Sequence, residues 1–192
     1  MSAALLLRLI LWPWLAAAVY AGHTLVLQRI HPAAVPAIVL LLATLALMAC
    51  LRLAPLRTAI ETVDLRRLVL LHAVRFTGIA YLVAHHRGDL PYRFAFPAGI
   101  GDLAIAATAL PIALAPIAET TRRHALAIWN IAGLCSLLLV LATATRLLFA
   151  DPESMRAFTE LPLSLGPTFL MPLLLASHVI VLMRLSSTAP RV

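Results

Sequence analysis

The chain has 192 residues, of which 62% are hydrophobic and only 12% are charged. A water-soluble domain has about 45–50% apolar and about 25% charged residues, so this composition excludes an ordinary soluble domain. The formal net charge is +7, but the basic residues are all arginines, and all but Arg75 lie between the apolar segments or near their ends. They form no basic surface interleaved with aromatic residues, so the charge does not predict a nucleic-acid partner; the expected surrounding is a lipid bilayer.

Six apolar segments follow one another along the chain, and each is long enough to cross the roughly 30 Å hydrocarbon core of a bilayer. The connections between them are short and leave no room for a soluble domain. The sequence therefore predicts an all-α membrane protein, a bundle of six transmembrane helices in one domain over residues 1–192. We expect the first segment to be retained rather than cleaved as a signal peptide. The predicted spans are about 4–27, 33–54, 66–84, 92–116, 122–149 and 161–185.

The arginines are distributed unequally between the two ends of these spans. Nine lie on one side and five on the other, while Arg75 lies within a span. Cytoplasmic loops carry an excess of basic residues, so the richer side is predicted to be cytoplasmic, with both termini there (N-in, C-in). The nine are Arg8, Arg52, Arg57, Arg66, Arg67, Arg122, Arg123, Arg184 and Arg191.

Two opposite charges lie deep in neighbouring spans, Arg75 in the third and Asp102 in the fourth. Because these two spans run in opposite directions, residues equally far from their connection lie at similar depth. A bare carboxylate in lipid costs at least a few kcal/mol, so we expect the two side chains to pair. The pair has two interpretations that remain open: a neutralised contact that fixes helix register, or a proton- or ligand-responsive site.

Helix-breaking residues lie close to Asp102. Pro97, Gly99 and Gly101 precede it within six residues. Such residues free backbone carbonyls, which protein or water must then satisfy. The start of the fourth span is therefore predicted to be the most irregular backbone in the chain.

A layer of polar residues is predicted nearer the cytoplasm, from His72, Asn130 and His178 on three different spans. His72 and Arg75 are three residues apart and share a helical face. Two histidines at one depth are candidate ligands of a metal or of haem b. His86 lies 14 residues after His72, which returns it to nearly the same face of an α-helix, and His23 is a weaker candidate from the first span.

Motifs for catalysis are scarce. Gly99-Ile100-Gly101-Asp102 matches the Gly-x-Gly-Asp signature of intramembrane aspartyl proteases, but that chemistry needs two aspartates, and no second one lies within a span. Cys50 and Cys135 fall in apolar segments and indicate neither a redox pair nor a metal site. The sequence does not predict an enzyme.

Two stretches carry a resemblance. Residues 75–78, 88–91 and 94–102, ending in FAFPAGIGD, together with GPTFLMP at 166–172 followed by His178, resemble segments of an uncharacterised group of small bacterial multi-pass inner-membrane proteins. The resemblance implies a location in the bacterial cytoplasmic membrane and carries no activity with it.

The leading functional hypothesis is transport or sensing of protons or of a small polar solute, with Asp102 as the titrating group and Arg75 as its counter-ion. One alternative is a subunit for electron transfer or assembly that binds haem b through His72 and His178. Another is a structural subunit of a larger membrane complex, or a homo-oligomer, as the small size and short loops allow.

Overall fold

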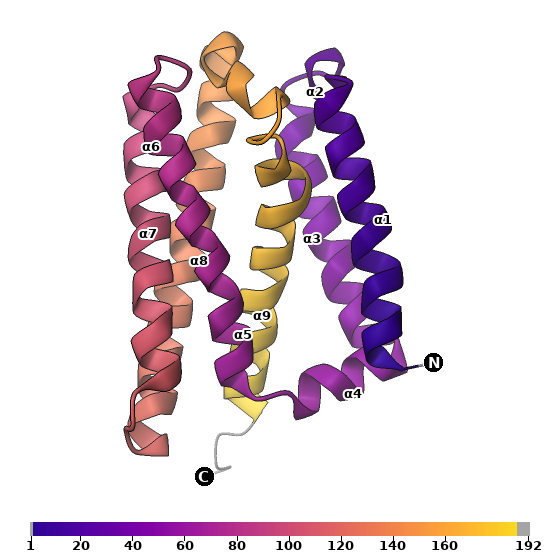
Figure 1. Cartoon of the computed structure of the whole chain (residues 1–192), viewed down its shortest axis with the longest axis vertical. Coiled ribbons are helices and arrows are strands. Elements are labelled where there is room, and N and C mark those ends of the chain that lie inside the picture. The colour runs from indigo at the N-terminus through magenta and orange to yellow at the C-terminus, as the bar shows by residue number, and fades with distance from the viewer. Residues whose placement is uncertain (1, 188–192) are drawn as a thin grey trace.

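The computed structural model describes residues 2–187, and every regular element in that range is a helix (Figure 1). Three of the elements are not α-helices: η1 and η2 are 3₁₀ helices, and η3 is a short π-helix. In chain order the elements are α1 (Ala3–His23), α2 (Val26–Arg29), α3 (Ala34–Arg52), α4 (Ala54–Thr62), α5 (Leu65–Leu71), η1 (His72–Gly78), α6 (Ile79–His86), α7 (Tyr92–Leu114), α8 (Glu119–Ala150), η2 (Pro152–Thr159), η3 (Gly166–Leu170) and α9 (Met171–Ser187).

Six helical stretches are long and apolar enough to cross a membrane. The prediction of six long apolar helices is thereby confirmed, while insertion into a bilayer and the orientation remain predictions. Two of the stretches are composite, because α5, η1 and α6 follow one another directly, and η3 continues into α9. The six stretches are Ala3–His23, Ala34–Arg52, Leu65–His86, Tyr92–Leu114, Glu119–Ala150 and Gly166–Ser187.

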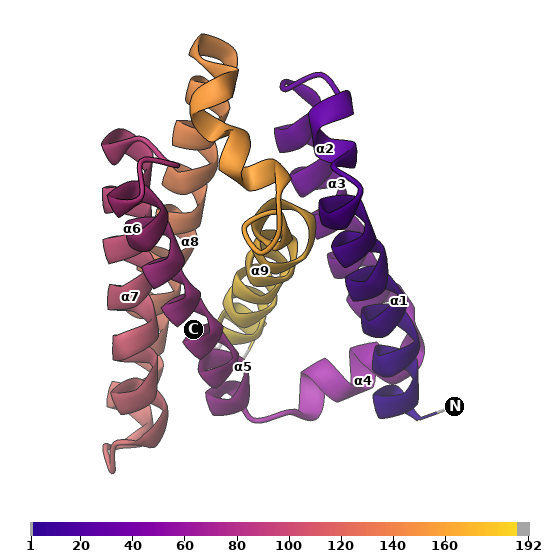
Figure 2. The same cartoon turned by 45° about the horizontal axis from the view of Figure 1, so that its top comes forward.

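One end of the molecule carries the start of α1, the end of α9 and the short helix α4 (Figures 1 and 2). The predicted spans leave most of α4 in the connection between the second and third spans, so this helix was not predicted. It buries Leu56, while Arg57 and Glu61 lie on its exposed side with 3.9 Å between Nε and Oε1. An even number of long helices returns the chain to the end at which it began, as the N-in, C-in prediction requires. Arg191, one of the nine arginines assigned to this end, lies outside the described residues.

The long helices are unequally buried. The α5–η1–α6 stretch, α7, α8 and α9 pack closely and enclose most of the core. Within α1 only Ala18 and Gly22 are buried, and within α3 only Val39 is buried. α3 packs against α9, and α1 lies farther out at the edge of the bundle (Figures 1 and 2).

α1 is joined to the rest of the bundle at the beginning of the last long stretch. The indole Nε1 of Trp14 donates a hydrogen bond of 2.8 Å to the carbonyl of Thr168, and the Trp14 and Phe169 rings meet edge to face at 5.3 Å. Pro172, four residues after Thr168, has no N–H to offer that carbonyl. The indole therefore satisfies an acceptor that the proline leaves without its usual helical partner.

The predicted break at the start of the fourth span is wrong. α7 runs without interruption from Tyr92 to Leu114, through Pro97, Gly99 and Gly101. Pro97 lies in the second turn, where its missing N–H removes a single helical hydrogen bond.

The two glycines serve close packing instead. A Cβ on Gly99 would lie 3.0 Å from the carbonyl oxygen of Gly78, and one on Gly101 would lie 3.0 Å from Ser136 Oγ. Small residues of this kind let helix backbones approach one another. The irregular backbone lies in η1 and η3, in the third and sixth long stretches.

Candidate functional site

The 3₁₀ helix η1 places three residues in a row facing the core. A 3₁₀ helix has three residues per turn, so side chains at every third position lie directly above one another. The buried residues of η1 are His72, Arg75 and Gly78, which have that spacing. Gly78 allows α7 to approach, because a Cβ there would lie 2.6 Å from the Cβ of Asp102. The row therefore directs Arg75 toward α7 at a point of close backbone approach.

Arg75 and Asp102 meet at the middle of their helices, as their predicted depths require. Arg75 Nη2 and Nε lie 2.7 Å and 2.9 Å from the same carboxylate oxygen, Oδ1. Arg75 is 1% exposed and Asp102 is 6% exposed. The structure thus brings the two predicted residues together in a buried, hydrogen-bonded ion pair.

Three further partners use the remaining donors of Arg75. Nη1 donates to the carbonyl of Gly133 at 3.1 Å and lies 3.5 Å from His178 Nε2, while Nη2 donates to Ser136 Oγ at 3.0 Å. A guanidinium has five N–H groups. With the two bonds to Asp102, each of the five has a protein acceptor, so Arg75 is fully satisfied within the protein.

The predicted polar layer is also assembled. His178 Nδ1 lies 2.8 Å from Asn130 Oδ1, and Asn130 Nδ2 donates to the His178 carbonyl at 3.0 Å. The amide oxygen can only accept, so Nδ1 carries the hydrogen and Nε2 presents its lone pair to Arg75. Asn130 therefore fixes both the position and the tautomer of His178.

His72 lies beside this pair of residues and contacts α9. Ser177 Oγ donates to the carbonyl of Leu174, and His72 Nε2 lies 2.9 Å from the same hydroxyl, so the imidazole donates to it. The His72 ring meets the Trp129 indole edge to face at 5.1 Å. His72 Nδ1 is buried and has no partner among residues 2–187.

This geometry does not fit the haem prediction. The ring centroids of His72 and His178 are 4.1 Å apart, and the two rings touch. A haem held by two histidines lies between their rings, with one nitrogen of each on the iron. Here the rings occupy that space themselves, and three of their four nitrogens face other side chains.

The weaker candidates His23 and His86 do not join the layer. Both are exposed, His23 at the end of α1 and His86 at the end of α6. The turn of η1 is tighter than that of an α-helix, so the 14-residue spacing from His72 no longer returns to the same face. Within the described part of the chain, no group of three or more His, Cys, Asp or Glu side chains is placed to hold a metal ion.

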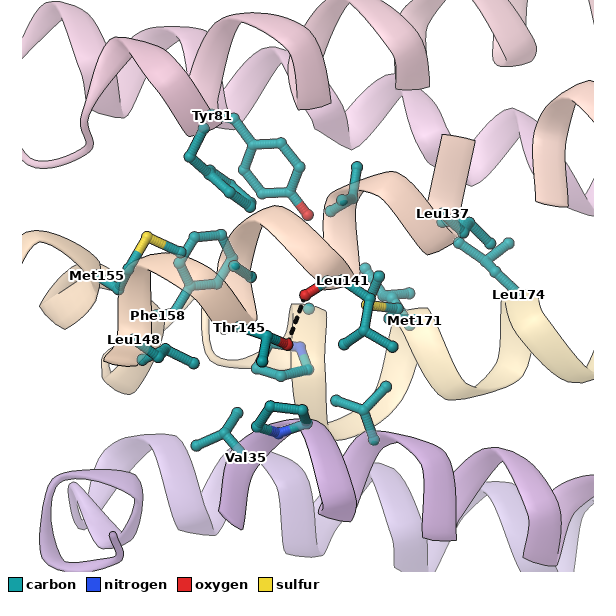
Figure 3. Close-up of a pocket in the computed structure, with 18 of the residues that line it drawn as sticks. Val35, Tyr81, Leu137, Leu141, Thr145, Leu148, Met155, Phe158, Met171 and Leu174 are labelled. Atoms are coloured by element: carbon teal, nitrogen blue, oxygen red, sulfur yellow. Dashed lines mark hydrogen bonds between the residues drawn. The ribbon is translucent and has the colours of Figure 1, made fainter. Parts of the chain in front are cut away.

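A cavity of about 80 Å³ adjoins the ion pair and is lined mainly by residues of α3, α8, η2, η3 and α9 (Figure 3). Asp102 and Arg75 are among the residues that line it, and most other lining residues are apolar. Asp102 uses only Oδ1 for Arg75, and its Oδ2 accepts no hydrogen bond from a described residue. The cavity therefore has apolar walls and one charged acceptor.

Several of these residues were not predicted from the sequence. Gly133 and Ser136 follow Asn130 at three-residue spacing on α8, a repeat of small and polar residues that marks the face toward Arg75. Ser177 adjoins His178, and no pattern singles it out. Tyr81 and the other cavity residues come from nine elements and have no common spacing.

These observations define a class: a helical protein with six long apolar helices, a buried ion pair at their middle and a cavity beside that pair. The model of a family described as a domain of unknown function (DUF8737) matches residues 32–186, and the chain belongs to this family. The match agrees with the expected resemblance to an uncharacterised group. No curated protein and no solved structure matches the chain.

Proposed function

We propose that the chain is an integral protein of the bacterial cytoplasmic membrane, that its six long helices span the bilayer, and that both ends face the cytoplasm. The exposed apolar surface supports this. Leu41, Ile128 and Leu139 are 58%, 71% and 68% exposed within long helices. Exposed apolar side chains are stable in contact with lipid. The excess of arginines at one end supports the proposed orientation, with that end in the cytoplasm.

Cysteine labelling tests the orientation. In a background with Cys50→Ser and Cys135→Ser, Asp89→Cys and Glu61→Cys place single thiols at exposed sites on opposite ends. A membrane-impermeant maleimide should label the thiol at position 89 on intact cells and the thiol at position 61 only after permeabilisation. The reverse pattern overturns the orientation, and equal labelling of both in intact cells overturns membrane spanning.

We further propose that the Arg75–Asp102 pair is the centre of transport or sensing linked to protons or to a small solute. The observation that carries this proposal is that Asp102 lines the cavity while its Oδ2 accepts no hydrogen bond from a described residue. A proton or solute that binds there weakens the hold of Asp102 on Arg75. Arg75 lies on η1, bonds to α8 and contacts His178 of α9. A change at Asp102 of α7 therefore alters contacts on η1, α8 and α9. A ligand that binds differently to two arrangements shifts the population between them.

Proteoliposomes with a trapped pH-sensitive dye test transport. An imposed pH gradient should collapse faster with the wild-type protein than with Asp102→Asn. The matched control is Asp64→Asn, because Asp64 Oδ1 accepts from Arg66 N at 2.9 Å as a helix cap and asparagine preserves that cap. Asp64→Asn should behave as wild type.

Tryptophan emission tests sensing in the same proteins. With Trp12→Phe and Trp14→Phe, Trp129 is the remaining tryptophan, and its ring lies 5.1 Å from that of His72. Its emission should change between acid and alkaline pH in the Asp102 protein and stay constant with Asp102→Asn. If neither the gradient nor the emission distinguishes Asp102 from asparagine, the proposal is wrong.

A further inference from the structure

The cavity that Asp102 lines lies where two unequally packed parts of the molecule meet. Val35 of α3 lies on one side of it and Phe158 of η2 on the other (Figure 3). Helices α1, α2 and α3 contribute few buried residues to the molecule, and of these Leu27 and Val39 line the cavity. Few buried contacts are typical of a part that separates from the rest at low cost. The buried residues of these three helices are Ala18, Gly22, Leu27 and Val39.

Gln28 joins the two parts beside the cavity. Its Nε2 donates to Thr159 Oγ1 at 3.0 Å and to Glu160 Oε1 at 3.5 Å, and this α2–η2 contact is exposed. Leu27, the neighbour of Gln28, and Thr159 itself both line the cavity. The contact therefore closes the cavity wall between α2 and η2, at the end of the molecule opposite to α4 (Figure 1). Because water competes for exposed hydrogen bonds, the net strength of the contact is modest.

The 3₁₀ helix η2 contributes side chains to two pockets. Met155 and Phe158 line the cavity, whereas Glu153 and Arg156 line a second pocket of about 660 Å³. With three residues per turn, positions 153 and 156 lie above one another, as do positions 155 and 158. The ion pairs of Arg156 with Glu153 and Glu160, both at 3.9 Å, are exposed and hold η2 only weakly. η2 is thus a single layer of chain with an apolar side toward the cavity and a charged side toward the outer pocket.

The backbone that leads into α2 is strained. Leu25, the residue before α2, has φ 55° and ψ 32°, in the left-handed region. A side chain of this size rarely adopts that conformation, because its Cβ approaches the following carbonyl oxygen. Such residues persist where the surrounding structure holds them, and they cluster at switch regions. The contact of Gln28 with η2 is placed to hold α2 in this conformation, so its release lets the backbone relax.

We propose that α2 and η2 form the outer gate of the cavity. The bonds of Gln28 hold the gate closed, and separation of α2 from η2 admits a small solute from the end predicted to face away from the cytoplasm. The volume of about 80 Å³ is several times the roughly 10–15 Å³ that one water molecule needs, so only a small solute fits. This inference rests on the proposed function of Asp102, and it names the regulation of access to that residue.

A thiol in the cavity wall measures opening without a transport assay. In the background with Cys50→Ser and Cys135→Ser, Val39→Cys places one thiol at a position that is 1% exposed. In nanodiscs, methyl methanethiosulfonate transfers a methylthio group to it at a rate that reports how often the cavity opens. Gln28→Leu removes the donor at nearly constant size and should accelerate this reaction at least fivefold.

Two further variants separate the gate from a general loosening of the protein. Thr159→Val keeps the shape and removes one acceptor of Gln28, so it should accelerate the labelling less than Gln28→Leu does. Ser154→Ala is the matched control on the same 3₁₀ helix, because its hydroxyl bonds to the nearby carbonyl of Asp151. Its labelling rate should equal that of the protein with Ser154.

A reversible crosslink tests the closed state. Gln28→Cys and Thr159→Cys, again without the native cysteines, are joined by a short bis-methanethiosulfonate and released by a reductant. The joined protein should collapse an imposed pH gradient in proteoliposomes as slowly as Asp102→Asn does, and the reductant should restore the faster rate. Gln28→Cys alone, treated in the same way, should keep the faster rate throughout.

Each contrary result has a distinct meaning. If Gln28→Leu leaves the labelling of Val39→Cys unchanged, or Ser154→Ala accelerates it equally, the gate is wrong, while the measurements on Asp102→Asn still judge the proposed function. A gradient that depends on Asp102 and collapses equally fast in the crosslinked protein also overturns the gate. Conversely, faster labelling with Gln28→Leu, without an effect of Asp102→Asn on gradient or emission, supports the gate and contradicts the proposed function.

Discussion

Arg75 and Arg122 are both buried, at 1% and 3% exposure, yet they lie in regions that use the same side chain differently. Arg75 lies at the middle of a long helix and bonds to groups 27 to 103 residues away in sequence. Arg122 lies in the first turn of α8 and donates to carbonyls at the end of α7 and in the connection, only 5 to 10 residues away.

The chemistry of the two regions follows from this difference. The last carbonyls of an α-helix have no helical partner, and a basic side chain near the helix end satisfies them. Arg122 is therefore a local cap for the carbonyls of Ile112, Ala113, Ala115 and Ile117, and Glu119 lies 3.5 Å from its Nε. A buried arginine does not by itself mark a functional site; what distinguishes Arg75 is a carboxylate partner that lines a cavity and has one oxygen without a hydrogen bond from a described residue.

The largest expected effect comes from breaking the central pair. Arg75→Met leaves Asp102 as an uncompensated buried charge and should lower the free energy of unfolding by about 3–5 kcal/mol. Unfolding by SDS in mixed micelles, followed by circular dichroism, measures it. Arg75→Met with Asp102→Leu removes both charges and should recover most of the loss. If the double variant were as unstable as the single one, the charge imbalance would not be the cause.

The pair was predictable from the sequence because its geometry is local. α6 and α7 are consecutive and antiparallel with a short connection, from His86 to Tyr92, so distance along the chain fixes depth. The contacts of Arg75 with α8 and α9 depend on how helices distant in sequence rotate against one another, and no residue count gives that rotation. The irregular backbone was misplaced for a related reason: proline and glycine mark either a break or a close approach, and residues 72–78 contain no proline.

The second largest effect is expected from a methyl group at Gly133. A Cβ there would collide with the His178 ring, 2.8 Å from its Nε2, and would lie 3.4 Å from Arg75 Nη1. Overpacking of this kind costs about 1–3 kcal/mol. Gly133→Ala should therefore destabilise the protein in the SDS assay by that amount.

Gly166→Ala is the matched control for Gly133→Ala. The nearest neighbours of a Cβ at position 166 lie at 3.5 Å or more, in ordinary contact. This variant should stay within about 0.5 kcal/mol of wild type. Equal losses from the two alanines would mean that helix flexibility, and not the approach of His178, requires the glycine.

A smaller and local effect is expected from Arg122→Met. The carbonyls it leaves are at a helix end, where water can replace a side chain, so the loss should be about 1–2 kcal/mol. Hydrogen exchange should accelerate in residues 112–118 and stay unchanged in η1. Arg75→Met should show the opposite distribution, and acceleration of η1 by Arg122→Met would contradict the separation of the two regions.

The smallest effect is expected from Ser136→Ala, which removes one of the four acceptor atoms around Arg75. The bonds to Asp102 and Gly133 remain, so the loss should be about 1 kcal/mol in the SDS assay. Ser154→Ala is the control, because its exposed hydroxyl bonds only to the nearby carbonyl of Asp151, and it should change stability by less than about 0.5 kcal/mol. A loss from Ser136→Ala as large as that from Arg75→Met would show that the five bonds form one cooperative unit, since buried hydrogen-bond networks can exceed the sum of their pairs. In that case the Arg75 region would differ from the Arg122 region in cooperativity as well as in partners.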